Sequence, residues 1–157
     1  MEEIMSRIKE INGKQIYYLK KIDKAIPPNE VEVTFDLSRL ELFRSSGQIQ
    51  LKYSEWQEPS FLDFTYFQDE LIIEEIQSRI RRIGHGRIML EFLLELIHIY
   101  NAKVEEYNKN STEVKFDSIT KVTGSMREGG GITHEELKLF YDNCGFLKNN
   151  QLLKEIK

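Results

Sequence analysis

The sequence predicts a mixed α+β domain with a central mixed β-sheet flanked by helices. Residues 31–77 are rich in β-branched and aromatic residues that partly alternate with polar ones, as strands require. After residue 86, apolar residues instead recur at helical spacing. The length of 157 residues suits one domain and allows a sizeable core. We find no internal repeat, low-complexity tract or linker, so we expect a single domain over residues 1–157.

The first half of the chain is expected to hold one short helix followed by four strands. Ile4, Ile8 and Ile11 stand at helical spacing within residues 1–23, which predicts the helix. The segment "IPPNE" at residues 26–30 is a break, because paired prolines resist both helix and central strand. The predicted strands are "VEVTFDL", "QIQLKY", "FLDFTYF" and "LIIEEIQ", with turns predicted at "SSGQ" (45–48) and "QEPS" (57–60).

The second half is expected to begin with a long helix from Gly86 to about Tyr107. Most of its residues are apolar, which predicts a helix that is buried on most sides against the sheet. A single polar stripe is formed by Arg87, Glu91, Glu95 and His98.

After this helix we expect a strand over residues 114–122 and a second helix over "THEELKLFYDNCGF". Thr133 and Glu136 have the spacing of a capping box, so the second helix should begin beside His134. The closing "FLKNNQLLKEI" fits a minimal hairpin with Asn149 and Asn150 at the turn, since asparagine tolerates positive φ.

Composition excludes several classes of function. The formal charge is −4 with no basic run longer than two residues, which argues against a nucleic-acid partner. Cys144 is the only cysteine, so no internal disulfide forms and a reducing compartment is expected. The acidic, mixed N-terminus is not a signal peptide, and no apolar stretch is long enough to span a bilayer. We therefore expect a cytoplasmic protein without a membrane partner. Three scattered histidines and one cysteine also predict no metal site.

The segment "RRIGHGRIML" places two arginines and two glycines directly before the long helix. Free backbone N–H groups and the positive end of the helix dipole converge at such a start, which favours an anion. The P-loop pattern is absent, and the dinucleotide pattern GxGxxG fails because Met89 occupies the third glycine's place. A different pattern, Arg/Gln-x-x-Gly-x-Gly/Ala, fits residues 81–86.

A second motif follows in "LKLFYDNCGF", where the pair Phe140-Tyr141 precedes Gly145-Phe146. With the glycine loop, and in the same order of elements, it resembles the GNAT superfamily of N-acetyltransferases. The resemblance covers roughly residues 70–146. It implies a GNAT-like fold and transfer of an acetyl group from acetyl-CoA to an amine acceptor that the sequence does not identify. Dimers are common in the family, so a homodimer is one expected state.

The resemblance also implies roles for individual residues. The strands "LIIEEIQ" and "KFDSITKV" would splay apart and admit the pantetheine arm, and Tyr141 would protonate the departing thiolate. Glu70 or Glu74 would serve as the base, because both share strand parity. The residues that would bind the cofactor are Arg81, Arg82, Ile83, Gly84, His85, Gly86 and Arg87, with Ile76 at the end of the fourth strand.

Plainer interpretations stay open beside these roles. Tyr141 has the spacing of a core residue, and His85 fits a loop residue. The glutamates of the fourth predicted strand fit the solvent-exposed side of that strand. The family also has two helices before its second strand, whereas this chain is mostly β there. The first alternative is therefore a non-catalytic GNAT-like binding or interaction protein, with or without CoA. A second alternative is a small α+β protein whose glycine loop binds another phosphate ligand.

Overall fold

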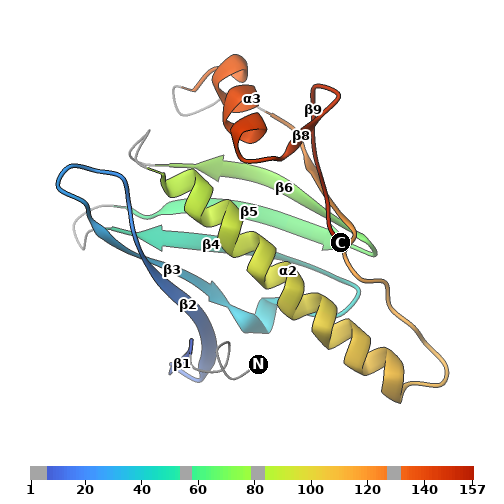
Figure 1. The fold of residues 1–157 in the computed structure, drawn as a ribbon. Coiled ribbons are helices and arrows are strands. Elements are labelled where there is room, and N and C mark those ends of the chain that lie inside the picture. Colours follow the sequence, from blue (N-terminus) through green and yellow to red (C-terminus); the bar gives the residue numbers. More distant parts are fainter. Residues whose placement is uncertain (1–6, 54–57, 79–83, 127–131) are drawn as a thin grey trace.

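The computed structural model describes residues 7–53, 58–78, 84–126 and 132–157, and they form a mixed α+β structure dominated by one large sheet (Figure 1). The predicted fold class is thus confirmed at this level. The nine-stranded sheet has the order β1-β2-β3-β4-β5-β6-β7-β9-β8, and its strand pairs are antiparallel except for β6 and β7. The strands are β1 (Ile8–Ile11), β2 (Lys14–Ile22), β3 (Glu30–Asp36), β4 (Arg44–Lys52), β5 (Ser60–Phe67), β6 (Glu70–Gln77), β7 (Lys121–Gly124), β8 (Leu147–Lys148) and β9 (Gln151–Glu155). The helices are η1 (Leu37–Arg39), α2 (His85–Asn110) and α3 (His134–Asn143).

The helix predicted near the N-terminus is wrong for the part that the structure describes. Ile8 and Ile11 lie in β1, which forms a hairpin with β2, while Ile4 lies outside the described residues. The turn is made by Asn12 and Gly13, which have φ angles of 52° and 78°. Asn-Gly is the residue pair that two-residue hairpin turns prefer, and strand pairing here outweighs the helical spacing of the isoleucines.

The four strands predicted over residues 31–77 are confirmed as β3 to β6, but the turn predicted at residues 45–48 is wrong. Those residues lie inside β4. Gly47 is needed there for packing, since a Cβ atom at this position would lie 2.6 Å from the ring of Phe35. The turn predicted at residues 57–60 is only partly described: Gln57 lies outside the described residues and Ser60 already begins β5.

α2 crosses one face of the sheet and supplies most of the helical core (Figure 1). The predicted polar stripe is confirmed, because Arg87, Glu91 and His98 are exposed and Glu95 is half-buried. The apolar sides of the helix bury Met89, Leu93, Leu96, Ile97 and Tyr100 against the sheet. The sheet contributes Val31, Val33, Phe35, Ile49, Leu51, Leu62, Phe64, Leu71 and Ile73.

The strand predicted over residues 114–122 is shorter and later than expected, since only Lys121–Gly124 pairs as β7. The segment before it is held by α2 instead. The side chains of Asn101 and Asn108 bond to the backbone of Ile119 and Phe116, respectively, each through one donated and one accepted hydrogen bond of 2.7–3.0 Å. These side-chain bonds replace strand pairing, so residues with strand propensity here need no neighbouring strand.

The C-terminal predictions are confirmed. α3 begins after Thr133, and the capping box between Thr133 and Glu136 is complete. Asn149 and Asn150 form the turn between β8 and β9 with φ angles of 53° and 63°. β9 pairs with β7, so the closing hairpin extends the sheet beyond β7.

Candidate functional site

A cavity of about 420 Å³ lies where the start of α2 meets α3 and the end of β6, and we call it the helix-start cavity. Five of the predicted cofactor residues line it: Ile76, Gly84, His85, Gly86 and Arg87. Arg81, Arg82 and Ile83 lie outside the described residues. The other residues that line it are Lys24, Ser78, Ile132, Glu136, Leu137, Leu139, Phe140, Asn143 and Cys144.

The start of α2 presents to this cavity backbone donors that have no acceptor within the helix. Gly84 is the N-cap, with a left-handed φ of 91° and no side-chain capping bond. The N–H of Ile88 is the first to bond back into the helix, at 3.0 Å from the carbonyl oxygen of Gly84. The preceding N–H groups of His85, Gly86 and Arg87 therefore lack an intrahelical acceptor. Together with the helix dipole they favour an anionic group.

Gly86 has a structural role that the sequence did not reveal. A Cβ atom at this position would lie 2.7 Å from Cζ of Phe140, so the glycine makes room for the aromatic ring of α3. Arg87 joins the same two helices, because its Nη2 donates to the carbonyl oxygen of Asn143 at 2.9 Å. That carbonyl lies at the end of α3, where helix carbonyls lack partners. Packing alone thus accounts for two residues of the predicted loop.

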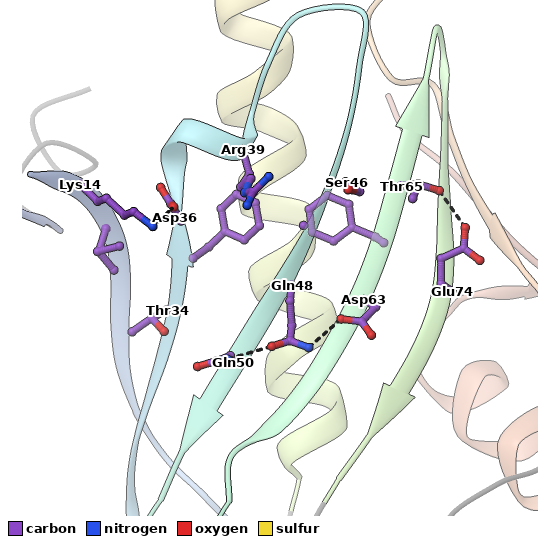
Figure 2. A pocket seen from close by; sticks show the side chains of 14 residues that line it. Lys14, Thr34, Asp36, Arg39, Ser46, Gln48, Gln50, Asp63, Thr65 and Glu74 are labelled. Atoms are coloured by element: carbon purple, nitrogen blue, oxygen red, sulfur yellow. Dashed lines mark hydrogen bonds and ion pairs between the residues drawn. The ribbon is translucent and has the colours of Figure 1, made fainter. Parts of the chain in front are cut away.

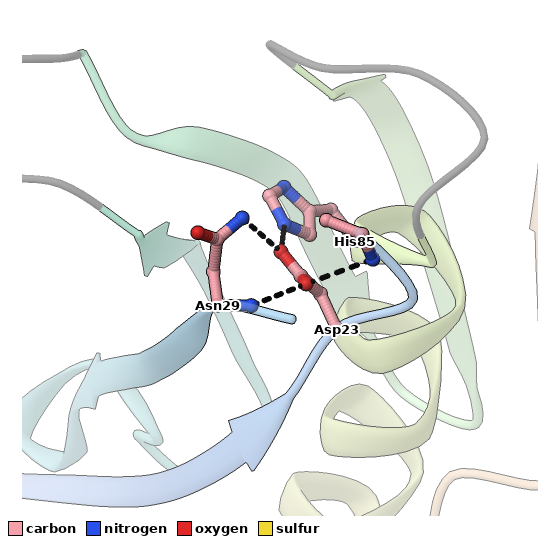
Figure 3. Close-up of polar contacts among 4 residues, drawn as sticks. Asp23, Asn29 and His85 are labelled. Atoms are coloured by element: carbon pink, nitrogen blue, oxygen red, sulfur yellow. Dashed lines mark hydrogen bonds and ion pairs between the residues drawn. The ribbon is translucent and has the colours of Figure 1, made fainter. Parts of the chain in front are cut away.

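His85 is the first residue of α2 and is buried, which corrects the interpretation of this residue as part of a loop. Its Nε2 lies 3.0 Å from Oδ2 of Asp23, and both side chains are fully buried (Figure 3). Asp23 stands at the end of β2, 62 positions earlier in the sequence. No local pattern links the two residues, so sequence reasoning had no signal with which to find the pair.

The environment of Asp23 fixes its charge. Burial by itself raises the pKa of this carboxyl group, but hydrogen bonds from both amides of Asn29, from His85 and from the N–H of Ala25 outweigh it. The pKa is held well below its usual range, so the group is an acceptor-only carboxylate. Nε2 of His85 must then carry the shared proton, while Nδ1 has no hydrogen-bond partner among the described residues. The pair ties the β2–β3 loop to α2 and places Lys24 on the cavity.

The parallel strands β6 and β7 part next to this cavity. They pair only from Glu70 to Ile73 on β6, opposite Lys121–Gly124, and β6 then continues to Gln77. The register with β5 shifts at the same place, because Phe64 pairs with Ile73 and Asp63 pairs with Glu75. Glu74 is therefore the extra residue of a β-bulge at the fork. Beyond it, β6 no longer pairs with β7 and continues to Ile76, which lines the helix-start cavity.

The two predicted bases occupy different parts of β6. Glu70 begins the strand and forms an ion pair of 3.8 Å with Lys121. Because it is six positions before Ile76, it lies roughly 20 Å from Ile76 along the strand. Glu74 lies at the fork and accepts a hydrogen bond of 2.8 Å from Oγ1 of Thr65. The geometry thus favours Glu74 over Glu70 as a group near the cavity.

Tyr141 lies in the core, with only 2% of its surface exposed. Burial raises the pKa of its hydroxyl, and the nearby Cys144 adds to the effect, so the hydroxyl stays protonated at neutral pH. Phe140, its neighbour on α3, lines the helix-start cavity, whereas Tyr141 does not. The position matches the core interpretation of this residue and leaves its proposed acid role as a prediction.

A second cavity of about 710 Å³, the sheet groove, opens on the face of the sheet opposite α2 (Figure 2). It spans five adjacent strands, β2 to β6, and only the polar residues that alternate along these strands could have indicated it beforehand. The lining residues are Lys14, Ile16, Thr34, Phe35, Asp36, Arg39, Ser46, Gly47, Gln48, Gln50, Asp63, Phe64, Thr65 and Glu74.

Comparison of the chain with protein-family models, curated proteins and solved structures gives no match. Within the part of the chain that the structure describes, no three His, Cys, Asp or Glu side chains are grouped to hold a metal ion. None of the described helices is long and apolar enough to cross a membrane.

Proposed function

We propose that this protein is a GNAT-like N-acetyltransferase that transfers an acetyl group from acetyl-CoA to an amine. The observation that carries the proposal is the joint placement of two features at one cavity. The N–H groups at the start of α2, which lack intrahelical acceptors, and the part of β6 that no longer pairs with β7 both lie at the helix-start cavity. An anionic head group with a long polar arm is the kind of ligand that can use both features at once.

The topology around the fork supports the same proposal. α2 connects the two parallel strands β6 and β7, and β9 pairs with β7 on its other side. Between β7 and β9 in the chain come α3 and the Gly145-Phe146 motif, in the order that the family resemblance implies. The large antiparallel part, β1 to β5, takes the place of the helices that the family has near its N-terminus.

The proposed chemistry assigns one task to each group. The N–H groups of His85, Gly86 and Arg87 bind the pyrophosphate, with Lys24 adding positive charge. Glu74 takes a proton from the acceptor ammonium, and the freed amine attacks the thioester carbonyl carbon. The C–N bond forms, the C–S bond breaks, and Tyr141 gives its proton to the thiolate that leaves. The attacking nitrogen loses its second proton to water, and a proton from water restores the tyrosine hydroxyl.

The non-catalytic alternative is favoured by one observation. Tyr141 is buried in the core and does not line the helix-start cavity, so the hydroxyl that the family resemblance names as the acid is not on its wall. A GNAT-like protein that binds CoA without turnover would keep the cavity and use the tyrosine only for packing.

Calorimetric titration with acetyl-CoA, CoA and ATP tests the proposal at the level of binding. We expect acetyl-CoA and CoA to bind and ATP to bind more weakly, because ATP lacks the pantetheine arm. An acetyl-transfer assay over polyamines, amino sugars, amino acids and lysine peptides then separates enzyme from binding protein. Turnover should rise with pH as the amine or its base deprotonates. Binding with no transfer to any amine would favour the non-catalytic alternative that binds CoA. No binding at millimolar ligand would refute the transferase and favour an interaction protein that does not bind CoA.

A further inference from the structure

The sheet groove lies on the opposite side of the sheet from α2, and its lining is polar, mixed in charge and aromatic in part (Figure 2). We propose that this groove is the acceptor site and that it takes an aminated polyol such as an amino sugar. The acceptor role rests on the proposed function, whereas binding of the amino sugar can be tested without it.

The charges of the groove favour a ligand with one cationic end. Asp63 and Glu74 supply carboxylates on β5 and β6. Lys14 and Arg39 lie at the other end, where Lys14 is 3.7 Å from Oδ2 of Asp36. The two ends of the groove are separated by the three strand spacings from β3 to β6, about 14 Å. An extended polyamine would place positive charge beside Lys14 and Arg39, so the groove disfavours a polycation.

The middle of the groove offers neutral hydrogen-bonding groups. Nε2 of Gln50 donates to Oε1 of Gln48, and Nε2 of Gln48 donates to Oδ1 of Asp63, both at 2.8 Å. Each amide nitrogen keeps a second hydrogen for a ligand, and the side-chain oxygen of Gln50 accepts. Hydroxyl groups of a sugar are both donors and acceptors, so they match this row. Thr34, Ser46 and Thr65 add hydroxyls along it.

The position of the groove on the sheet separates a sugar from a peptide. Phe35 and Phe64 line it at Gly47 but are almost fully buried, so they form its floor. The groove also lies over the middle of the sheet, where β2 to β6 pair with one another. It therefore presents no strand edge with which an extended peptide backbone pairs.

The fork joins the groove to the helix-start cavity. Glu74 lines the groove and Ile76 lines the cavity, and they are two positions apart on β6, about 7 Å. An amine held at Glu74 thus stands beside the part of β6 that no longer pairs with β7, along which the proposed thioester arm lies. A ligand bound in the groove has its reactive end at the fork and its hydroxyl groups over β4.

NMR titration of the full chain with glucosamine tests the assignment. We expect saturable shifts of the side-chain amide signals of Gln48 and Gln50, and weaker binding of glucose, spermidine and a lysine peptide. Glu74→Gln and Asp63→Asn should each weaken glucosamine binding about tenfold, the loss of one charge-assisted hydrogen bond. Glu75→Gln is the matched control, because Glu75 is exposed and lines neither cavity, and its affinity should be unchanged. Thermal unfolding of each variant verifies that it is folded.

These experiments distinguish failure of the amino-sugar site from failure of the proposed function. No glucosamine shift at millimolar concentration, or tighter binding of spermidine or the lysine peptide, overturns the inference even if acetyl-CoA binds. Glucosamine binding without any acetyl-CoA binding overturns the acceptor role, because no donor then exists. Binding of both ligands, with acetylation of glucosamine that Glu74→Gln slows and Glu75→Gln does not, supports it.

Discussion

The two cavities of this protein are built in opposite ways. The helix-start cavity is bounded by element ends, where backbone N–H groups have no acceptor within their helix and the buried hydrogen bond between Asp23 and His85 holds a loop in place. The sheet groove is lined by side chains on paired strands, so its backbone groups are already satisfied. The first cavity therefore offers backbone donors and a helix dipole, and the second offers side-chain amides, hydroxyls and carboxylates. A ligand's phosphate fits the first and a polyol fits the second.

The largest expected effect concerns turnover, through the core residue Tyr141. Tyr141→Phe keeps the buried ring and removes the hydroxyl, so the fold should survive while the rate of acetyl transfer falls by roughly 10²–10⁴-fold. Affinity for acetyl-CoA should be nearly unchanged, which places the loss in the chemical step. Steady-state kinetics and calorimetry measure both quantities. Normal turnover by the variant would show that Tyr141 is a core residue only.

The buried pair should matter for stability more than any single contact of the groove. Asp23→Asn removes the carboxylate that His85 and the β2–β3 loop bind, and we expect a loss of about 3 kcal/mol in the free energy of unfolding at pH 7. Asp142→Asn, on the exposed side of α3, is the control and should change stability by less than about 0.5 kcal/mol. Urea unfolding measures both variants.

The same variant has a defined pH dependence. The pKa of Asp23 is lower in the folded protein than in an unfolded chain. Its stabilising contribution is therefore fully present above the unfolded value, near pH 4, and is lost as the pH falls toward the folded pKa. The stability gap between wild type and Asp23→Asn should shrink below about pH 4. A gap that stays constant into the acid range would mean that the charge of Asp23 contributes nothing.

Gly86 allows a sharper test of how α3 closes the helix-start cavity. Gly86→Ala should destabilise by about 1–3 kcal/mol, because the added methyl meets the ring of Phe140 at 2.7 Å. In a Phe140→Ala background the same change should stabilise by up to about 1 kcal/mol, since alanine is the better helix former. Unfolding of the four proteins in this cycle measures the coupling. An equal effect of Gly86→Ala in both backgrounds would remove Phe140 as the reason for the glycine.

The smallest effect is expected from the charge at the rim of the cavity. Lys24→Ala should weaken acetyl-CoA binding about fivefold, because an exposed ammonium contributes only about 1 kcal/mol to a phosphate contact. Lys21→Ala, three positions earlier and lining neither cavity, should bind as the wild type does. Calorimetry at low salt distinguishes the two, and equal affinities would place the anionic group away from Lys24.

The features that the sequence predicted well are those with a local period. The faces of α2, the capping box at Thr133 and the Asn149-Asn150 turn are all set by residues within a few positions of one another. The Asn12-Gly13 hairpin was also local, but the isoleucine spacing gave a competing helical signal that strand pairing overrode. Sequence reasoning could not reach the contacts that join distant segments. Asp23 with His85 and Gly86 with Phe140 depend on how β2 and α3 pack around α2, which no spacing encodes.

The central claim is that the start of α2 and the forked edge of β6 together bind acetyl-CoA. NMR titration of the isotope-labelled chain tests it directly, because each backbone amide reports separately. The account predicts saturable shifts of the amides of His85, Gly86 and Arg87 with acetyl-CoA, and much smaller shifts with acetyl-pantetheine, which lacks the pyrophosphate. Amides of β3 and β4 on the sheet groove should stay unmoved by either ligand. Unmoved amides at the start of α2 under millimolar acetyl-CoA, or shifts confined to the groove, would contradict the account.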